Sequence, residues 1–261
     1  MALYQDQVIT LKARPYRDHD ALVTVFARQN GKFSAVARGV RRPKSKLAGQ
    51  LRPLTVSVAT FYHGRSSLDT VTEADLEHGF SKLADNLERL SWAMVLADIV
   101  DQLVPERETA KDSFTVLKAA LKALHEGRHA ASVGLRTGFL LLAAAGFAPD
   151  WTVCSDCHQP LVRGPVAISV QGGSVHCPAC QRHLAQVEEL ISLGSLRSLQ
   201  YWLNDSPSKF GQFEVKGLME EELKRLLFRY MLHETARPLK SYEFLMNIDR
   251  LQRGPEGGSK R

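Results

Sequence analysis

The chain has 261 residues and a formal net charge of +6, and 44% of its residues are hydrophobic. This composition is ordinary for a globular protein and argues against a disordered or low-complexity chain. The most apolar run, Gly138 to Phe147, is about half the length of a membrane-spanning helix, and the first residues contain no basic segment followed by an apolar one. We therefore expect a cytoplasmic protein.

The positive charge is concentrated in one segment of the chain. Residues 21–68 contain no Asp or Glu and nine Lys or Arg, so this segment carries +9 and the rest of the chain carries −3. Like charges held this close repel each other unless a polyanion or counterions offset them. Nucleic acid is therefore the leading candidate partner and an anionic membrane surface the second. In the simpler alternative, the segment is a solvent-exposed loop whose charge has no partner.

The first part of the chain is predicted to form five short strands rich in Val, Thr and Phe. We expect these strands at residues 7–13, 21–27, 32–38, 54–62 and 66–74. Asn30-Gly31 supplies the positive φ angles of a tight hairpin between the second and third strands. Residues 38–53 contain Pro43 and Pro53 and should form a long exposed connection with a short helix. Five strands with one such connection indicate an OB-type barrel at residues 1–78.

Beyond residue 79, apolar residues recur at spacings of three and four, which predicts a helical domain in two parts, 79–150 and 186–248. One face of its first helix should carry Leu83, Leu87, Leu90, Met94, Ala97 and Val100. Further helices are expected at residues 111–126, 129–146, 187–203 and 218–236. Residues 249–261 should form a disordered tail. The predicted fold class is α+β: a five-stranded OB-type barrel followed by an all-helical domain with an embedded four-cysteine module.

That module, residues 151–185, holds two CxxC pairs: Cys154, Cys157, Cys177 and Cys180. Such pairs can direct four soft thiolate ligands at one ion in a tetrahedral arrangement. Zinc fits best, and four protein ligands leave no open position for catalysis, so we expect a structural Zn²⁺. Two redox pairs, chance spacing and an iron–sulfur cluster are weaker alternatives. Three nearby histidines are not assigned as ligands: His158, His176 and His183.

No catalytic constellation is visible. The sequence lacks a glycine-rich phosphate loop, a GxSxG elbow and an HExxH pair. Asp98 and Asp101 can share a helix face, but without a histidine partner a solvated face is more plausible than the metal site of a nuclease. We therefore predict a protein that is not an enzyme. Among the aromatic residues near the basic charge, Tyr62 and His63 are the retained candidates for base stacking.

Three short stretches, together with the cysteine spacing, resemble the RecO family of bacterial DNA repair proteins and recombination mediators. They are GK followed by ARG (31–32 and 37–39), KSKLAG followed by LxP (44–53), and GRxxLDT (64–70). The likeness extends along most of the chain, apart from its C-terminal end. It implies an N-terminal OB fold, a helical domain and an embedded zinc module, the architecture that the patterns above predict separately.

The resemblance also implies a function. Members of this family bind single- and double-stranded DNA, anneal complementary strands, work with the ring-forming protein RecR, and help a RecA-type recombinase displace single-strand-binding protein. A nucleoid-associated protein without covalent chemistry and without a membrane partner is thus implied. Carried over residue by residue, the family's DNA-binding surface consists of Lys32, Arg38, Arg41, Arg42, Lys44, Lys46, Arg52 and Arg65. Ser34 stands where some members have Lys or Arg, which puts that contact in doubt.

Two expectations about partners stay open. The acidic, aromatic-ended tail of single-strand-binding protein would suit an apolar groove with a basic rim. Lys224, Arg225 and Arg229 offer such a rim, although an ordinary amphipathic core helix explains the same residues more simply. The alternative function is that of an RNA-binding or ribosome-associated protein, because OB folds and zinc ribbons occur there too and basic charge does not distinguish the two polymers.

Overall fold

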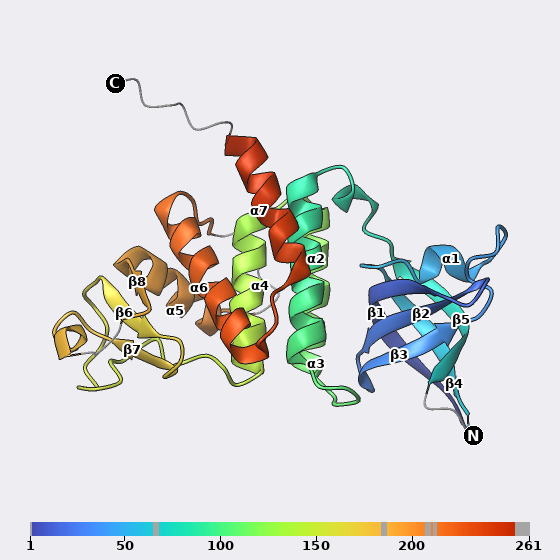
Figure 1. Cartoon of the computed structure of the whole chain (residues 1–261), viewed down its shortest axis with the longest axis horizontal. Coiled ribbons are helices and arrows are strands. Elements are labelled where there is room, and N and C mark those ends of the chain that lie inside the picture. The colour runs from blue at the N-terminus through green and yellow to red at the C-terminus, as the bar shows by residue number, and fades with distance from the viewer. Residues whose placement is uncertain (1, 65–67, 184–186, 207–209, 211–212, 254–261) are drawn as a thin grey trace.

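The computed structural model describes the chain except for residues 1, 65–67, 184–186, 207–209, 211–212 and 254–261. The molecule is elongated, with a β-barrel at one end, a group of helices in the middle and a small sheet at the other end (Figure 1). This arrangement confirms the predicted α+β fold class. In the described part of the chain, no helix is long and apolar enough to cross a membrane.

Five strands form the barrel: β1 (Ala2–Tyr16), β2 (Asp20–Ala27), β3 (Gly31–Ala37), β4 (Val56–His63) and β5 (Asp69–His78). They close in the order β1-β2-β3-β5-β4, and all neighbours are antiparallel except β3 and β5. Alternate side chains such as Val23, Val25, Phe33 and Ala35 point inward and form one apolar cluster. The five-stranded barrel agrees with the predicted OB type.

The helices of the second half are η1 (Ser81–Leu83), α2 (Leu87–Leu103), α3 (Lys111–His125), α4 (Ala130–Ala144), α5 (Leu193–Asn204), α6 (Leu218–Thr235) and α7 (Lys240–Arg253). Helix α4 packs against α2, α3, α5 and α6. Close approach to α2 requires Gly134, because a Cβ atom at this position would lie 2.0 Å from the Trp92 ring. The small residues of α4 thus let the helices meet around it.

Three expectations about this half differ from the structure. Residues 189–191, expected in a helix, form strand β8 (Glu189–Ile191), because they pair with β6 (Val166–Ser169). Helix α7 continues beyond residue 248, where we expected the helical domain to end. Leu87 and Met94 are exposed, whereas Ala97 and Val100 are buried as expected. The buried face of α2 also includes Trp92, Val95, Leu96 and Ile99. This helix is buried over so much of its surface that simple periodicity misplaces its core face.

The barrel and the helices share one apolar core. Ile9 and Phe26 of the barrel belong to the same cluster as the helical residues, and the Phe26 and Phe114 rings lie 5.6 Å apart. Beside this core, the Lys12 ammonium group lies 2.9 Å from Asp98 and 2.8 Å from Asp101. These two aspartates, expected on a solvated face, therefore hold the barrel against α2.

The connection between α2 and α3 reaches the end of the barrel where β4 ends and β5 begins. Its Arg107 guanidinium lies 4.0 Å from the centre of the Phe33 ring and 2.6 Å from the Asp69 carboxylate, whose side chain is 0% exposed. Asp69 also accepts a hydrogen bond from the Tyr4 hydroxyl at 2.5 Å and contacts the His63 ring at 2.6 Å. One buried carboxylate therefore joins three strands to the helical domain.

Asp69→Asn tests this junction. Burial opposes ionisation of Asp69, but hydrogen bonds from Tyr4, Arg107 and His63 outweigh it and lower the pKa of the carboxyl group. A lowered pKa contributes stability above the unfolded value of about 3.9, and this contribution is lost as the pH falls through the folded value. We expect the variant to lose about 1–3 kcal/mol of unfolding free energy at pH 7, because the buried side chain loses its charge-assisted hydrogen bonds with Tyr4, His63 and Arg107.

The difference between Asp69→Asn and the unchanged protein should then shrink in urea titrations below about pH 4. Asp75→Asn, at an exposed position of the same strand, is the control and should change stability by less than about 0.5 kcal/mol. Equal stability of the Asp69 variant and the unchanged protein at pH 7 would contradict this account of the junction.

Candidate nucleic-acid interface and metal centre

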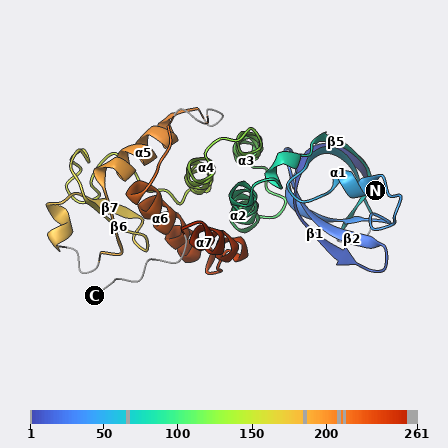
Figure 2. The ribbon, with the colours of Figure 1, turned by 90° about the horizontal axis from the view of Figure 1, so that it is seen from above.

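Residues 38–53 connect β3 to β4 and are called the basic loop below. The loop contains the short helix α1 (Leu47–Gln50), which lies over one end of the barrel (Figure 2). Six of the predicted DNA-binding residues belong to it, and all six are exposed: Arg38, Arg41, Arg42, Lys44, Lys46 and Arg52. In the described part of the chain, none of these side chains forms an ion pair with a carboxylate.

The backbone of the basic loop is anchored to the barrel. Val40 and Leu51 are buried in the barrel's apolar core. The hydroxyl groups of Thr55 and Ser57 donate hydrogen bonds to the Gln50 carbonyl at 3.0 Å and 2.6 Å, which satisfies an acceptor at the end of α1. The cations are therefore presented from a fixed loop, and less conformational entropy is lost when a ligand binds than for a free loop.

The structure places Lys32 elsewhere. Its side chain is only 10% exposed, its ammonium group donates to the Asp101 carbonyl, and the Asp101 carboxylate lies 3.6 Å away. Lys32 therefore holds the barrel on α2, and we leave it out of the interface. Arg65 lies outside the described residues. Of the two stacking candidates, Tyr62 is 37% exposed, whereas the His63 ring is bound to Asp69.

Sequence reasoning missed the role of Arg107. Its guanidinium group joins the buried Asp69 to the helical half, and its backbone N–H donates to the Lys32 carbonyl at 2.8 Å. No local pattern marks this residue, because it lies in an irregular connection just after Pro105. Asp69 belongs to the GRxxLDT stretch. An acid in a predicted strand can pair with a basic residue far along the chain, and this is the one signal in the sequence for the contact with Arg107.

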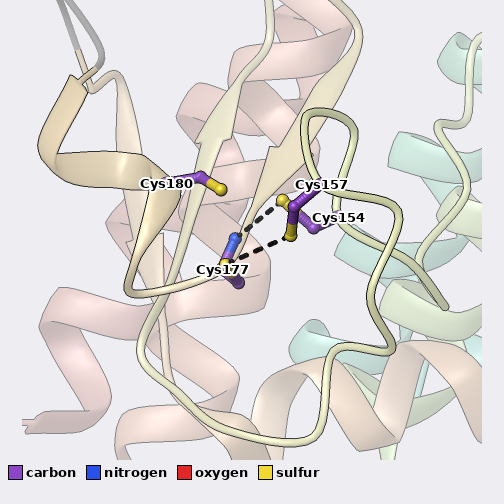
Figure 3. Close-up of side chains that lie close together, drawn as sticks. All are labelled: Cys154, Cys157, Cys177 and Cys180. Carbon is purple, nitrogen blue, oxygen red and sulfur yellow. Dashed lines mark hydrogen bonds between the residues drawn. The ribbon is translucent and has the colours of Figure 1, made fainter.

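The four cysteines converge in space, as Figure 3 shows. Their Sγ atoms all lie within 4.8 Å of one another, and those of Cys157 and Cys177 are 3.9 Å apart. Four thiolates around one ion at about 2.3 Å place their sulfur atoms roughly 3.8 Å apart in a tetrahedron. The donor set and the spacing therefore fit a tetrahedral metal ion with four protein ligands.

Two tight turns position these thiols. In the first turn the His158 N–H donates to the Cys154 carbonyl at 2.9 Å, and in the second the Gln181 N–H donates to the Cys177 carbonyl at 3.0 Å. A small sheet of β6, β7 (Ser174–His176) and β8 lies beside them, in the order β7-β6-β8. Strands β6 and β7 run antiparallel between the two turns, and β8 adds a third strand on the other side of β6.

The close approach of the four thiols shifts the pKa values of two of them in opposite directions. Burial opposes ionisation of Cys154, but hydrogen bonds from backbone N–H groups outweigh it and lower the pKa of this thiol to about 6. Hydrogen bonds with Cys157 and Cys177 raise the pKa of Cys180 to about 12. Both ring nitrogens of His176 are engaged, with Asp156 and Ser174 at 2.8 Å each, so His176 is held as a neighbour of the cluster.

The cysteine module is braced against the helical domain. Glu189 of β8 is buried, and its carboxylate lies 2.7 Å from Arg225 and 2.8 Å from Arg229 on α6. Lys224 is also buried and pairs with Glu220 at 3.1 Å. The three cations expected as the rim of a groove on α6 are therefore paired within the fold.

An apolar groove of about 520 Å³ lies instead beside α5. It is lined by Gly194, Arg197, Ser198, Tyr201, Phe213 and Met219. Tyr201 and Phe213 are exposed, and their rings lie 6.2 Å apart. The groove thus combines an aromatic surface with one arginine at its edge.

An ion bound by the four cysteines should stabilise the protein, so its removal should lower stability and leave the predicted DNA binding unchanged. A strong chelator, or Cys154→Ser, should lower the unfolding free energy by several kcal/mol, because a structural metal contributes its binding energy to folding. The cluster lies at the end of the molecule opposite the barrel, so the DNA affinity of each folded molecule should not change (Figure 1). Calorimetry and filter binding measure the two quantities.

His183→Ala is the control, because His183 is exposed and outside the four-sulfur cluster. The chelator should lower the melting temperature of this variant as much as that of the unchanged protein and should have no effect on Cys154→Ser. A melting temperature that the chelator leaves unchanged in all three proteins would count against a structural metal.

Two family models match the chain. The model for the N-terminal part of recombination protein O matches residues 1–80, and the model for its C-terminal part matches residues 84–243. The DNA repair protein RecO of Symbiobacterium thermophilum is 32% identical over 94% of this chain and 97% of its own length. That of Pelotomaculum thermopropionicum is 32% identical over 98% of both chains. Fold and comparisons lead to one conclusion: the chain belongs to the RecO family of DNA repair proteins.

Proposed function

We propose that this protein is a non-enzymatic recombination mediator that binds single- and double-stranded DNA and anneals complementary strands. With RecR it would help a RecA-type recombinase onto DNA coated with single-strand-binding protein. The observation that carries the DNA-binding part is the basic loop, with six exposed cations on an anchored backbone. Membership of a DNA repair family supports DNA over other polyanions.

Annealing by such a loop needs charge and geometry alone. Two complementary strands repel each other through their phosphates, and Lys and Arg side chains that replace their counterions lower this repulsion. Contacts to phosphates leave the base edges free to pair and read no sequence, so sequence preference should be weak. No proton transfer or nucleophile is required, which fits a protein that is not an enzyme.

We also propose that the four cysteines hold Zn²⁺ in a structural role. Zinc prefers four-coordinate sites of this kind, and four thiolate ligands leave no position for water or substrate. The brace between Glu189 and α6 then connects the metal module to the helical domain. Zinc would contribute to the stability of this half and take no part in annealing.

The direct test is annealing of complementary fluorescent oligonucleotides without any nucleoside triphosphate. The variant changes Arg41, Arg42, Lys44 and Lys46 to Ala and should anneal at least tenfold more slowly, because it loses four phosphate contacts. The control variant removes the same charge from exposed positions of the helical half: Lys82, Lys111, Arg237 and Lys240. It should anneal at nearly the unchanged rate.

If both variants anneal equally slowly, the net charge of the protein, and not the basic loop, is responsible for annealing. No annealing by the unchanged protein, combined with tighter binding to RNA than to DNA of the same sequence, would favour the RNA-binding alternative. Circular dichroism of each variant shows whether its fold is unchanged.

The groove beside α5 is the proposed site for the C-terminal tail of single-strand-binding protein. That tail is acidic and ends in an aromatic residue, and the groove offers Tyr201 and Phe213 for the ring and Arg197 for an acidic group. The helix α6 surface suits it less, because Arg225 and Arg229 already pair with Glu189. The partner would thus contact the helical half while DNA contacts the barrel.

A labelled peptide of this tail should bind the intact protein, and Arg197→Ala should weaken binding about tenfold, the loss of a charge-assisted hydrogen bond. Arg237→Ala, an exposed arginine outside the groove, is the control and should bind normally. Fluorescence anisotropy measures both affinities. Identical affinities of the two variants would remove this groove from the proposal.

A further inference from the structure

The hairpin between β1 and β2 is fastened to the basic loop. The Arg41 N–H donates to the His19 carbonyl at 2.9 Å, and the Gly39 N–H donates to the Asp20 carboxylate at 2.8 Å. The Arg41 guanidinium also donates to the Asp18 carbonyl at 3.3 Å. Residues 16–20 are therefore held beside the basic loop in one arrangement.

The outer face of β1, β2 and β3 can be followed through its strand register. Arg14 lies opposite Leu22, and Leu22 lies opposite Val36, so the three side chains share one face. Tyr16, two residues beyond Arg14, lies on the same face opposite Asp20. This face is the surface through which OB folds commonly bind oligonucleotides.

Helix α2 covers one half of this face. In the next row of the register, Lys12 is opposite Thr24, and the Lys12 ammonium group is paired with Asp98 and Asp101 of α2. Further along, Lys32 is buried against the same helix. The two carboxylates thus neutralise Lys12, which is therefore not available to bind phosphates. The half of the face that carries Arg14 and Tyr16 is not covered by α2.

The accessible half has the chemistry of a single-strand site. Arg14 and Arg17 are exposed, and among the described residues neither forms an ion pair with a carboxylate. The Arg17 guanidinium lies 5.2 Å from the centre of the Tyr16 ring. An aromatic ring flanked by arginines binds an unpaired base by stacking and the adjacent phosphates by charge. Asp18 is the exposed acid in this hairpin.

We propose that Tyr16, Arg14 and Arg17 form a single-strand platform that extends the basic loop. A DNA strand held by the loop would continue over the hairpin, with one base against Tyr16 and the phosphates near Arg14 and Arg17. The inference rests on the proposed DNA binding by the basic loop and adds a preference for unpaired bases. Double-stranded DNA has no free base to stack, so it would use the loop alone.

The test compares the affinities of the full chain for an unstructured oligonucleotide and for its duplex. Tyr16→Ala should weaken single-strand binding on the order of tenfold and leave duplex binding unchanged, whereas Tyr16→Phe keeps the stacking ring and should bind normally. Arg14→Ala combined with Arg17→Ala should reduce the salt slope for single strands by about 1.4, or 0.7 for each lost contact.

Asp18→Asn is a control that should change single-strand affinity in the opposite direction. It removes a negative charge from the hairpin, so it should tighten single-strand binding if the strand passes there. Unchanged single-strand affinity in Tyr16→Ala, or an equal loss for both DNA forms, would overturn the platform. If the variant of Arg41, Arg42, Lys44 and Lys46 loses DNA while all hairpin variants bind normally, only this inference fails. If that loop variant still binds DNA normally, the proposed function of the loop fails first.

Discussion

The ion pair between the buried Asp69 and the partly exposed Arg107 is the constraint on which the arrangement of the two halves depends. Asp69 lies where β1, β4 and β5 meet, and Arg107 comes from the connection between α2 and α3. A buried carboxylate without its partners is costly, so the barrel end and this connection stabilise each other. Gly31 completes the contact, because a Cβ atom there would lie 2.0 Å from the Glu108 carbonyl oxygen. The barrel is thus fixed on the helices and is not a module on a flexible linker.

This fixed junction determines which surfaces remain free. Asp98 and Asp101 pair with Lys12, and Asp101 also holds Lys32, so α2 covers part of the outer face of the barrel. The basic loop places α1 over one end of the barrel (Figure 2), and its six cations are exposed. The cysteine module is at the far end of the molecule (Figure 1). The basic loop, the four cysteines and the groove beside α5 therefore lie in separate parts of the molecule.

Much of this architecture follows from local sequence. Alternating apolar residues and the Asn30-Gly31 turn predict the barrel strands, since a strand with one buried face repeats every two residues. The spacing of Cys154, Cys157, Cys177 and Cys180 predicts their convergence, because a CxxC turn directs both thiols to one side. The prolines and the like charges of residues 38–53 likewise predict an exposed connection with exposed basic side chains.

The remaining features depend on contacts between distant residues. Lys32 has the same charge as its neighbours in sequence, and only the position of α2 shows that it is buried. Strand β8 is three residues long and exists because β6 pairs with it, whereas its own sequence predicts part of a helix. Asp98 and Asp101 have the spacing of a solvated helix face, and only their pairing with Lys12 and Lys32 of the barrel shows their role. Tertiary contacts override local propensity at each of these positions.

The most direct measurement of the central claim is the salt dependence of single-strand affinity for the unchanged protein. If the six cations of the basic loop contact phosphates, the logarithm of affinity should fall with the logarithm of salt concentration, and the loop alone should contribute a slope near −4, about 0.7 for each contact. The affinity should then drop by more than a hundredfold between 50 and 200 mM salt, roughly as that slope requires. A slope near zero would contradict the account, because no counterions would then be released by the loop.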